Sequence, residues 1–161
     1  MQSVVPITRK WAEQYVSYAY APPYTFYNIP EEYRAEEVEE LISPASAAET
    51  FAVLEDGLMI GFYMYTHDPV NDTVELGLGL APEKTGQGRG TAFVRESLAF
   101  YRGQHPDFRG TFTLRVADFN LRARSVYENC GFRVYDRQYA VSYGTTPVTF
   151  LCMRLEANAI S

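Results

Sequence analysis

The stretch Thr85-Gly86-Gln87-Gly88-Arg89-Gly90-Thr91 decides the fold of this chain of 161 residues. It follows an apolar, strand-like run from Val74 to Leu80 and precedes a helical pattern that continues to about Tyr101. Alternate glycines let the backbone pass close to a ligand, and the next helix begins with unpaired N–H groups and a positive dipole end. The stretch predicts a loop that binds a phosphorylated ligand. An ordinary strand-to-helix turn without a ligand is the alternative.

Two known phosphate loops do not fit this spacing. A P-loop ends in Gly-Lys followed by Ser or Thr, and a dinucleotide fingerprint places its third glycine one residue later. The stretch from Leu80 to Thr91 instead resembles the acyl-CoA pyrophosphate loop, Q/R-x-x-G-x-G/A, of the GCN5-related N-acetyltransferase (GNAT) superfamily. Thr85 stands where that family usually has Arg or Gln, so one side-chain contact to the phosphates is missing.

A second motif lies between Val116 and Phe132. Asn120, Ala123 and Tyr127 recur at i, i+3 and i+7, so a helix places them on one face. Asp118 or Asn120 is a candidate N-cap, and Gly131 is a candidate C′ residue. A short helix with a defined start and end is predicted.

The pattern N-x-x-A-x-x-x-Y-x-x-x-G-F of this second motif resembles the other half of the GNAT cofactor site. The resemblance covers roughly Thr50 to Leu155 and implies a single-domain α/β GNAT fold over residues 1–161. The implied sheet is mixed and mostly antiparallel, with about six to seven strands and about four helices. Acetyl-CoA is the implied cosubstrate, and no metal is expected.

The resemblance also implies which residues contact the cofactor. Leu78 and Leu80 are expected to offer backbone groups to the pantetheine arm and the thioester. The other expected contacts are Thr85, Gly86, Gln87, Gly88, Arg89, Gly90, Thr91, Asn120 and Ala123.

The run from Val74 to Leu80 alternates, so its leucines share one face and Glu75, Gly77 and Gly79 share the other. Glycine weakens a strand unless another group approaches closely. The glycine face therefore predicts a surface on which an extended ligand binds. A helix packed over the glycines is the alternative.

The implied chemistry is acyl transfer from a thioester to an amine. An alkylamine is mostly protonated at neutral pH, so a base must take its proton. Glu75, directly or through a water, is the candidate, and a structural bond is its alternative. The resemblance assigns Tyr127 as the general acid toward the leaving sulfur, and a phenol holds its proton at neutral pH. A core tyrosine is the alternative for Tyr127.

The acceptor site is expected on the Pro-rich, aromatic loop from Ala21 to Pro30. In GNAT proteins this segment commonly forms one wall of the site, so Tyr24, Phe26 and Tyr27 are candidate lining residues. The same rings can also pin the loop to the core. A small-molecule amine, a peptide N-terminus and a lysine all remain open as acceptors. A non-catalytic acyl-CoA-binding sensor or partner module is the competing function.

Composition narrows the class of protein. The apolar content of 47% and charged content of 21% are those of a globular domain, and the net charge of −6 argues against nucleic-acid binding. Only Cys130 and Cys152 are present, without metal spacing, which favours a reducing compartment. With no signal peptide and no apolar run of membrane length, a cytoplasmic protein that does not bind membranes is expected. The oligomeric state is left open, a homodimer included.

The remaining elements follow from periodicity and turn residues. The acid-rich segment from Pro30 to Ile42 predicts a solvated helix, Asp56-Gly57 predicts a hairpin turn, and His67 is expected on a surface turn. A further helix is expected over Arg9 to Tyr18, and strands over Val4 to Thr8, Thr50 to Leu54, Leu58 to Thr66, Phe112 to Val116, Arg133 to Tyr143 and Thr146 to Leu155.

Overall fold

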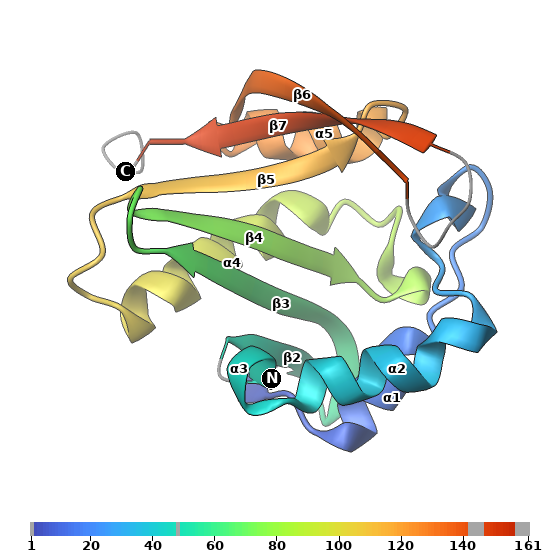
Figure 1. The fold of residues 1–161 in the computed structure, drawn as a ribbon. Coiled ribbons are helices and arrows are strands. Elements are labelled where there is room, and N and C mark those ends of the chain that lie inside the picture. Colours follow the sequence, from blue (N-terminus) through green and yellow to red (C-terminus); the bar gives the residue numbers. More distant parts are fainter. Residues whose placement is uncertain (1, 48, 142–146, 157–161) are drawn as a thin grey trace. The chain divides into compact units, whose positions relative to one another are not determined.

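The computed structural model describes residues 2–47, 49–141 and 147–156 (Figure 1). Its strands are β1 (Gln2–Pro6), β2 (Thr50–Glu55), β3 (Leu58–Asp68), β4 (Thr73–Leu80), β5 (Thr111–Ala117), β6 (Arg133–Val141) and β7 (Pro147–Leu155). Its helices are α1 (Arg9–Val16), α2 (Glu31–Ile42), α3 (Pro44–Ala47), α4 (Gly90–Gln104) and α5 (Leu121–Asn129), with 3₁₀ turns η1 (Tyr24–Tyr27) and η2 (Pro82–Lys84).

The strands form one seven-stranded sheet in the order β1-β2-β3-β4-β5-β7-β6. The pairs β1–β2, β2–β3, β5–β7 and β6–β7 are antiparallel, whereas β4 and β5 are parallel. The predicted mixed, mostly antiparallel sheet is confirmed. Over the described residues the α-helices number five, not about four. The extra one, α3, is a single turn, too short for a periodic pattern.

The chain divides into two compact units. The first unit comprises the residues up to Met64 together with Leu78–Gly86, and the second comprises Tyr65–Gly77 and the residues from Gln87 onward. Both β3 and β4 therefore contribute residues to each unit.

In the first unit, the predicted hairpin joins β2 to β3. Asp56 and Gly57 both have positive φ, 53° and 81°, as a primed two-residue turn requires. Helices α1 and α2 lie side by side (Figure 1). Val38 and Leu41 of α2 are buried while most of its glutamates are exposed, so the predicted solvated face is confirmed. The core of this unit includes Ile7, Ala12, Val16, Ile29, Ala52, Val53, Ile60 and Tyr63.

In the second unit, β5 pairs with β4 on one side and with β7 on the other. The predicted helical pattern is present as α4, whose buried residues are Phe93, Val94, Ser97, Leu98 and Tyr101. The other core residues include Val74, Leu76, Phe112, Leu114, Val116, Phe132, Leu151, Met153 and Leu155.

Several element boundaries differ from the sequence-based expectation. Helix α1 ends at Val16, two residues before Tyr18, and α4 begins at Gly90, inside the stretch expected to form the loop, and continues to Gln104. His67 lies within β3, because this strand runs on to Asp68 before the turn begins. The expected strand ends around Gly144 lie outside the described residues. Within the described chain, no helix has the length and apolar character needed to cross a membrane.

Candidate functional site

The glycine loop has a backbone that suits an anion. Gly86 and Gly88 have φ of 71° and 73°, and Arg89, which follows Gly88, is right-handed at φ −87° and ψ −13°. A left-handed residue followed by a right-handed one turns successive N–H groups toward a common point, which is a preferred arrangement for phosphate. Among the described residues, no atom lies within 4 Å of a Cβ built on Gly88. The loop therefore fits the pyrophosphate expected there.

The third glycine of the loop has a different physical reason. A Cβ on Gly90 would lie 3.0 Å from a methyl carbon of Val126, so this glycine lets α4 approach α5 closely. Gly90 and Thr91 open α4 and are half-buried, and the helix start offers them as backbone donors. Two glycines thus shape the loop and the third packs two helices.

Thr85, the departure from the family pattern, makes a local bond. Its hydroxyl donates to the carbonyl of Pro82 at 2.7 Å, which closes the η2 turn. Because the hydroxyl proton is used in this bond, the expected contact of Thr85 with a phosphate would have to come from its backbone.

Helix α5 has the predicted start and end. The Oδ1 of Asn120 accepts the N–H of Ala123 at 3.1 Å, so Asn120, not Asp118, is the N-cap. At the other end Gly131 has φ 99°, its N–H donates to Glu128, and the N–H of Phe132 donates to the carbonyl of Tyr127. These two bonds form a Schellman motif, which explains the Gly-Phe of the sequence pattern.

The same motif positions Tyr127. Phe132 is completely buried, and its ring lies 6.0 Å from the Tyr127 ring at 64°. Asn120, Ala123 and Tyr127 are all half-buried, as expected for one face of a helix that packs on its side. The helix is confirmed, and the roles of these three residues stay predictions.

Glu75 forms an ion pair that the sequence did not reveal. Its Oε2 accepts the Nε–H of Arg115 at 2.9 Å, and both side chains are half-exposed. The parallel register of β4 and β5 places Glu75 opposite Thr113, and Arg115 projects from the same face of β5. The structural bond considered for Glu75 is therefore present, and its oxygens remain near solvent.

The end of β4 lies in the first unit. The carbonyl of Leu80 accepts the hydroxyl of Tyr20 at 2.8 Å, and Leu78 and Leu80 are half-exposed. A Cβ on Gly79 would lie 2.9 Å from the Phe62 ring, so the missing side chain makes room for an aromatic ring. At Gly79, the Phe62 ring therefore occupies the space in which the sequence predicted an extended ligand.

The three aromatic candidates for the acceptor site lie on η1. Tyr24 and Phe26 are half-buried, Tyr27 is 36% exposed, and the rings of Phe26 and Tyr27 lie 5.4 Å apart. Asn28 holds the preceding loop, because its side chain accepts from the N–H of Tyr20 and donates to its carbonyl. Since Asn28 already holds the loop, the exposed parts of the rings are accessible to a ligand.

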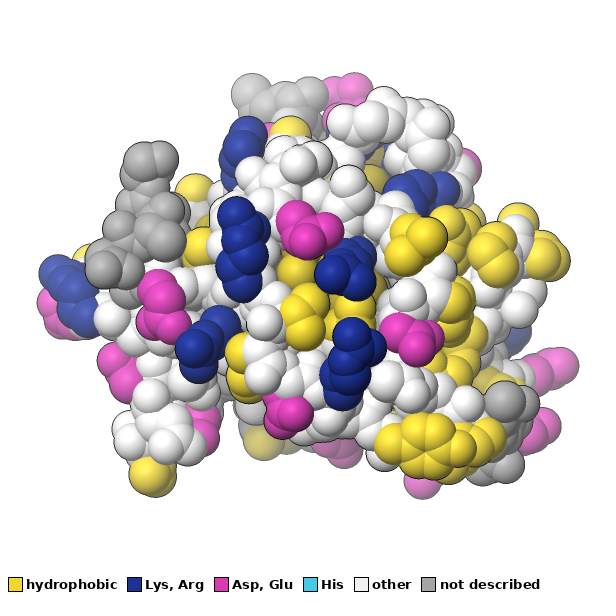
Figure 2. Space-filling model, turned by 90° about the horizontal axis from the view of Figure 1, so that it is seen from above, with side chains coloured by type: hydrophobic (Ala, Val, Ile, Leu, Met, Phe, Trp, Pro, Cys, Tyr) yellow, Lys and Arg dark blue, Asp and Glu magenta, His cyan; other side chains and the backbone are white. Residues whose placement is uncertain are grey.

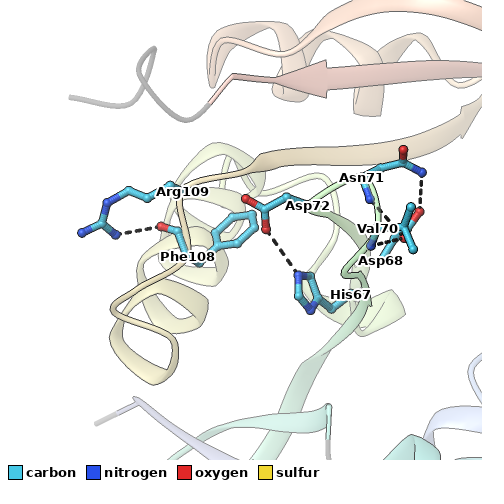
Figure 3. Close-up of polar contacts among 7 residues, drawn as sticks. All are labelled: His67, Asp68, Val70, Asn71, Asp72, Phe108 and Arg109. Carbon is cyan, nitrogen blue, oxygen red and sulfur yellow. Dashed lines mark hydrogen bonds and ion pairs between the residues drawn. The ribbon is translucent and has the colours of Figure 1, made fainter.

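His67 lies near the end of β3, beside a turn that side-chain hydrogen bonds hold (Figure 3). The Asp68 carboxylate accepts from the N–H groups of Val70 and Asn71 and from the Asn71 amide, and these bonds lower the pKa of Asp68. The Nε2 of His67 lies 3.5 Å from Asp72. Within the described part of the chain, no group of three or more His, Cys, Asp or Glu residues is arranged to hold a metal ion.

Neither cysteine has the environment of a nucleophile. Burial raises the pKa of the Cys130 thiol, whose Sγ lies 3.7 Å from the Thr91 carbonyl, and burial also raises the pKa of Cys152. A raised pKa keeps a thiol protonated and unreactive.

On the face seen from above the view of Figure 1, Lys and Arg side chains stand among acidic ones, with apolar atoms between them (Figure 2). Oppositely charged side chains also form ion pairs, as Arg124 does with Glu128 and Arg154 does with Glu156. This face does not show the one-sign basic patch typical of nucleic-acid binding.

The predicted site residues are divided between the two units. The second unit brings together Glu75, Gln87, Gly88, Arg89, Gly90, Thr91, Asn120, Ala123 and Tyr127. The first unit holds Leu78, Leu80, Thr85, Gly86, Tyr24, Phe26 and Tyr27. Sequence reasoning missed Arg115 and Tyr20, which contact two of these positions. An alternating polar face on the strand of Arg115 was the available signal for the first, and nothing local signalled the second.

Comparisons with known proteins agree with this geometry. A model of the Acetyltransferase (GNAT) family matches residues 11–132. Among solved structures, a dodecameric spermidine N-acetyltransferase from Vibrio cholerae superposes with a TM-score of 0.72 at 17% identity, covering 98% of this chain and 94% of that one. The spermidine/spermine N-acetyltransferase SpeG from Vibrio cholerae, in complex with manganese ions, gives a TM-score of 0.73 at 18% identity, with 98% and 93% covered. No curated protein sequence matches the chain.

Proposed function

The chain belongs to the acetyltransferase (GNAT) family, and from this premise we propose that it transfers an acetyl group from acetyl-CoA to a primary amine of a small molecule. The observation that carries the proposal is the backbone of the glycine loop. Gly88 in the left-handed region, Arg89 in the right-handed region and the start of α4 together present N–H groups suited to a pyrophosphate.

The cofactor contacts proposed from the family pattern come from the loop and from two flanking elements. Backbone groups of Leu78 and Leu80 bind the extended arm, the loop from Thr85 to Thr91 binds the phosphates, and Asn120 and Ala123 on α5 complete the set. When bound, acetyl-CoA supplies an activated acyl group to the amine. The exposure of these residues supports the proposal, since Gly86, Gln87 and Gly88 are exposed, the others are half-buried, and a ligand can cover each of them.

Two side chains are proposed to move protons. Glu75 takes a proton from the amine, directly or through a water, while Arg115 holds one of its oxygens at 2.9 Å and so orients the carboxylate. Tyr127 holds a proton on its phenol that it can give to the leaving group, and the Schellman motif at the end of α5 keeps its backbone in place. Neither role needs a metal.

A small-molecule amine is proposed as the acceptor, in preference to a peptide N-terminus or a lysine. The structurally similar Vibrio cholerae enzymes are named for spermidine, which supports a small amine. We further propose that residues 1–161 act as one acetyltransferase domain. The two free cysteines fit a cytoplasmic location, because thiols stay reduced there.

Thermal unfolding with and without acetyl-CoA tests the proposal first. Ligand at a hundred times its dissociation constant should add about 2.7 kcal/mol to the free energy of unfolding. Gly88→Trp, which fills the open space at the loop, should abolish this effect. No shift at millimolar acetyl-CoA would contradict the proposed function.

Release of CoA with a panel of amines then separates the two classes of function. Turnover with a small amine supports the enzyme, whereas binding of acetyl-CoA without CoA release on any amine would establish the alternative, a non-catalytic acyl-CoA-binding module. Faster release with a peptide or a lysine than with small amines would contradict the proposed acceptor class.

A further inference from the structure

Tyr18, in the first unit, carries a polar atom whose interaction is missing. Its side chain is 7% exposed, and its hydroxyl is shielded from solvent and has no hydrogen-bond partner among the residues that the structure describes. A buried hydroxyl without a partner is costly, so native structures normally supply one. A group bound from outside the chain or a trapped water can supply this missing bond.

The ring of Tyr18 belongs to a cluster of aromatic rings. The Tyr15 ring lies 6.1 Å from that of Tyr18, the Tyr20 ring lies 6.3 Å from it, and Phe62 lies 4.6 Å from Tyr15. Tyr15, Tyr20 and Phe62 are each half-exposed, unlike Tyr18. A cluster of such rings at a surface attracts cations through their π-faces.

A carboxylate lies near the same rings. Glu83 is exposed on η2, three residues after Leu80, whose carbonyl accepts the Tyr20 hydroxyl. Burial raises the pKa of Tyr18 and Tyr20, and the negative charge of Glu83 raises both further. A negative charge therefore acts on the rings from the side of η2.

The position of this cluster is well defined within the unit. Asn28 bonds both backbone groups of Tyr20, at 2.7 Å and 3.2 Å, and the Tyr20 hydroxyl is bonded to Leu80 at 2.8 Å. Leu80 is one of the strand positions proposed to contact the cofactor arm, so the cluster adjoins the end of β4. A ligand bound to the cluster would find it already in place, which lowers the entropic cost of binding.

We propose that Tyr18, Tyr20, Glu83 and the rings of Tyr15 and Phe62 form a subsite for an alkylammonium group of the acceptor. The ammonium donates a hydrogen bond to the Tyr18 oxygen and is neutralised by Glu83. The reacting amine gives its proton to Glu75 in the proposed mechanism, so we assign the ammonium that stays charged beside Glu83 to a second amino group of the same molecule. The acceptor class is therefore a diamine or polyamine, an assignment that rests on the proposed acetyl transfer.

The test compares 1,4-diaminobutane with 1-aminobutane, which lacks the second amino group, by calorimetry at neutral pH in the presence of saturating CoA. The diamine should bind the unmodified protein about tenfold more tightly or better, because a hydrogen bond to a charged group is strong. Tyr18→Phe and Glu83→Gln should each remove most of this preference.

Tyr65→Phe is the matched control. The Tyr65 hydroxyl is buried like that of Tyr18 but donates to the Ser97 carbonyl at 2.8 Å. Its loss should lower the thermal midpoint and leave diamine binding unchanged. Tyr18→Phe should not lower the midpoint of the ligand-free protein, because it removes an unpaired hydroxyl.

Equal binding of the two amines, or diamine binding unaffected by Tyr18→Phe, would overturn the subsite. A midpoint lowered by Tyr18→Phe as much as by Tyr65→Phe would overturn it too, since a trapped water would then be the partner. Diamine binding that depends on Tyr18 without any CoA release would support the subsite and contradict the proposed function instead. The two failures are thus distinguishable.

Discussion

At the residue scale, the proposed general acid is Tyr127. Tyr127→Phe keeps the ring against Phe132 and removes only the proton donor. Because a thiolate is already a fair leaving group, kcat should fall by about ten- to hundredfold without reaching zero. CoA release measures this effect, and Tyr139→Phe on an exposed side chain of β6 is the control. An unchanged kcat for Tyr127→Phe would remove it from the mechanism.

Glu75 and Arg115 can be separated by a double-mutant cycle. If Glu75 is the base, Glu75→Gln should lower kcat by about a hundredfold, and Arg115→Gln should lower it much less. All three variants of the cycle should unfold nearly as the unmodified protein does, because an exposed ion pair contributes about 0–1 kcal/mol. Equal losses of kcat in both single variants and the double variant would show that Glu75 acts only as the partner of Arg115.

The role of a side chain could be predicted from the sequence only where its partner lies close to it in sequence. Asn120 as a cap and Gly131 as a C′ residue were predictable, because both act on the helix next to them in sequence. The pairing of Glu75 with Arg115 was not, since it depends on which strands become neighbours. For the same reason, no sequence pattern could show that the hydroxyl of Tyr18 has no partner.

At the element scale, we expect opposite effects on stability when two glycines are replaced, one just before α4 and one inside it. Gly88 precedes the helix with φ 73°, whereas Gly103 lies inside it, and neither has an atom within 4 Å of a built Cβ. Gly88→Ala should cost about 1–2 kcal/mol, because an L-residue is strained in the left-handed region. Gly103→Ala should stabilise by about 0.5–1 kcal/mol.

Chemical denaturation with and without acetyl-CoA measures both changes. Gly88→Ala should also weaken the binding of acetyl-CoA, while Gly103→Ala should leave it unchanged. Stabilisation by Gly88→Ala would contradict the left-handed geometry of the loop.

Elements with a strong period or a specific turn were predictable. The hairpin at Asp56-Gly57, the buried stripe of α4 and the alternation in β4 are all present. The single-turn helix α3 and the turn η1 were missed, because they are shorter than any period that a sequence can display. Ends shifted by a few residues, as with α1 and α4, since capping and packing decide the last turn.

At the scale of the whole molecule, alkaline pH should destabilise the fold. Burial and then Glu83 raise the pKa of Tyr18, and burial, Tyr18 and Glu83 raise that of Tyr20. The ordinary pKa of a phenol is about 10, so the unfolded chain releases these protons first. Their contribution to stability is complete below about pH 10 and is lost as the pH rises above it.

Phenolate absorbance and circular dichroism, followed together from pH 9 upward, check this expectation. The last two phenols should ionise only as the ordered structure is lost. A variant with both Tyr18→Phe and Tyr20→Phe should lose less stability above pH 10, whereas Tyr139→Phe should behave as the unmodified protein. Ionisation of every phenol before unfolding would contradict the burial of these two.

The family and the sheet class could be predicted from two motifs, because the glycine loop and the α5 pattern are both local and are specific when they occur together. The division into two compact units could not. Its boundaries at Met64 and Gly77 fall inside β3 and β4, where the sequence shows continuous strands without Gly-Pro-rich linkers. Contacts distant in sequence, not composition, decide where a unit ends.

The order in which the chain enters and leaves these units limits how the protein can be divided into fragments. The chain passes from one unit to the other after Met64, Gly77 and Gly86. No single break in the chain would yield two polypeptides that each contain one unit and nothing else. Neither unit could therefore have been exchanged between genes as one continuous segment. A protease that cuts the chain after Gly77 would divide both units, whereas a cut after Met64 or after Gly86 would divide only one of them.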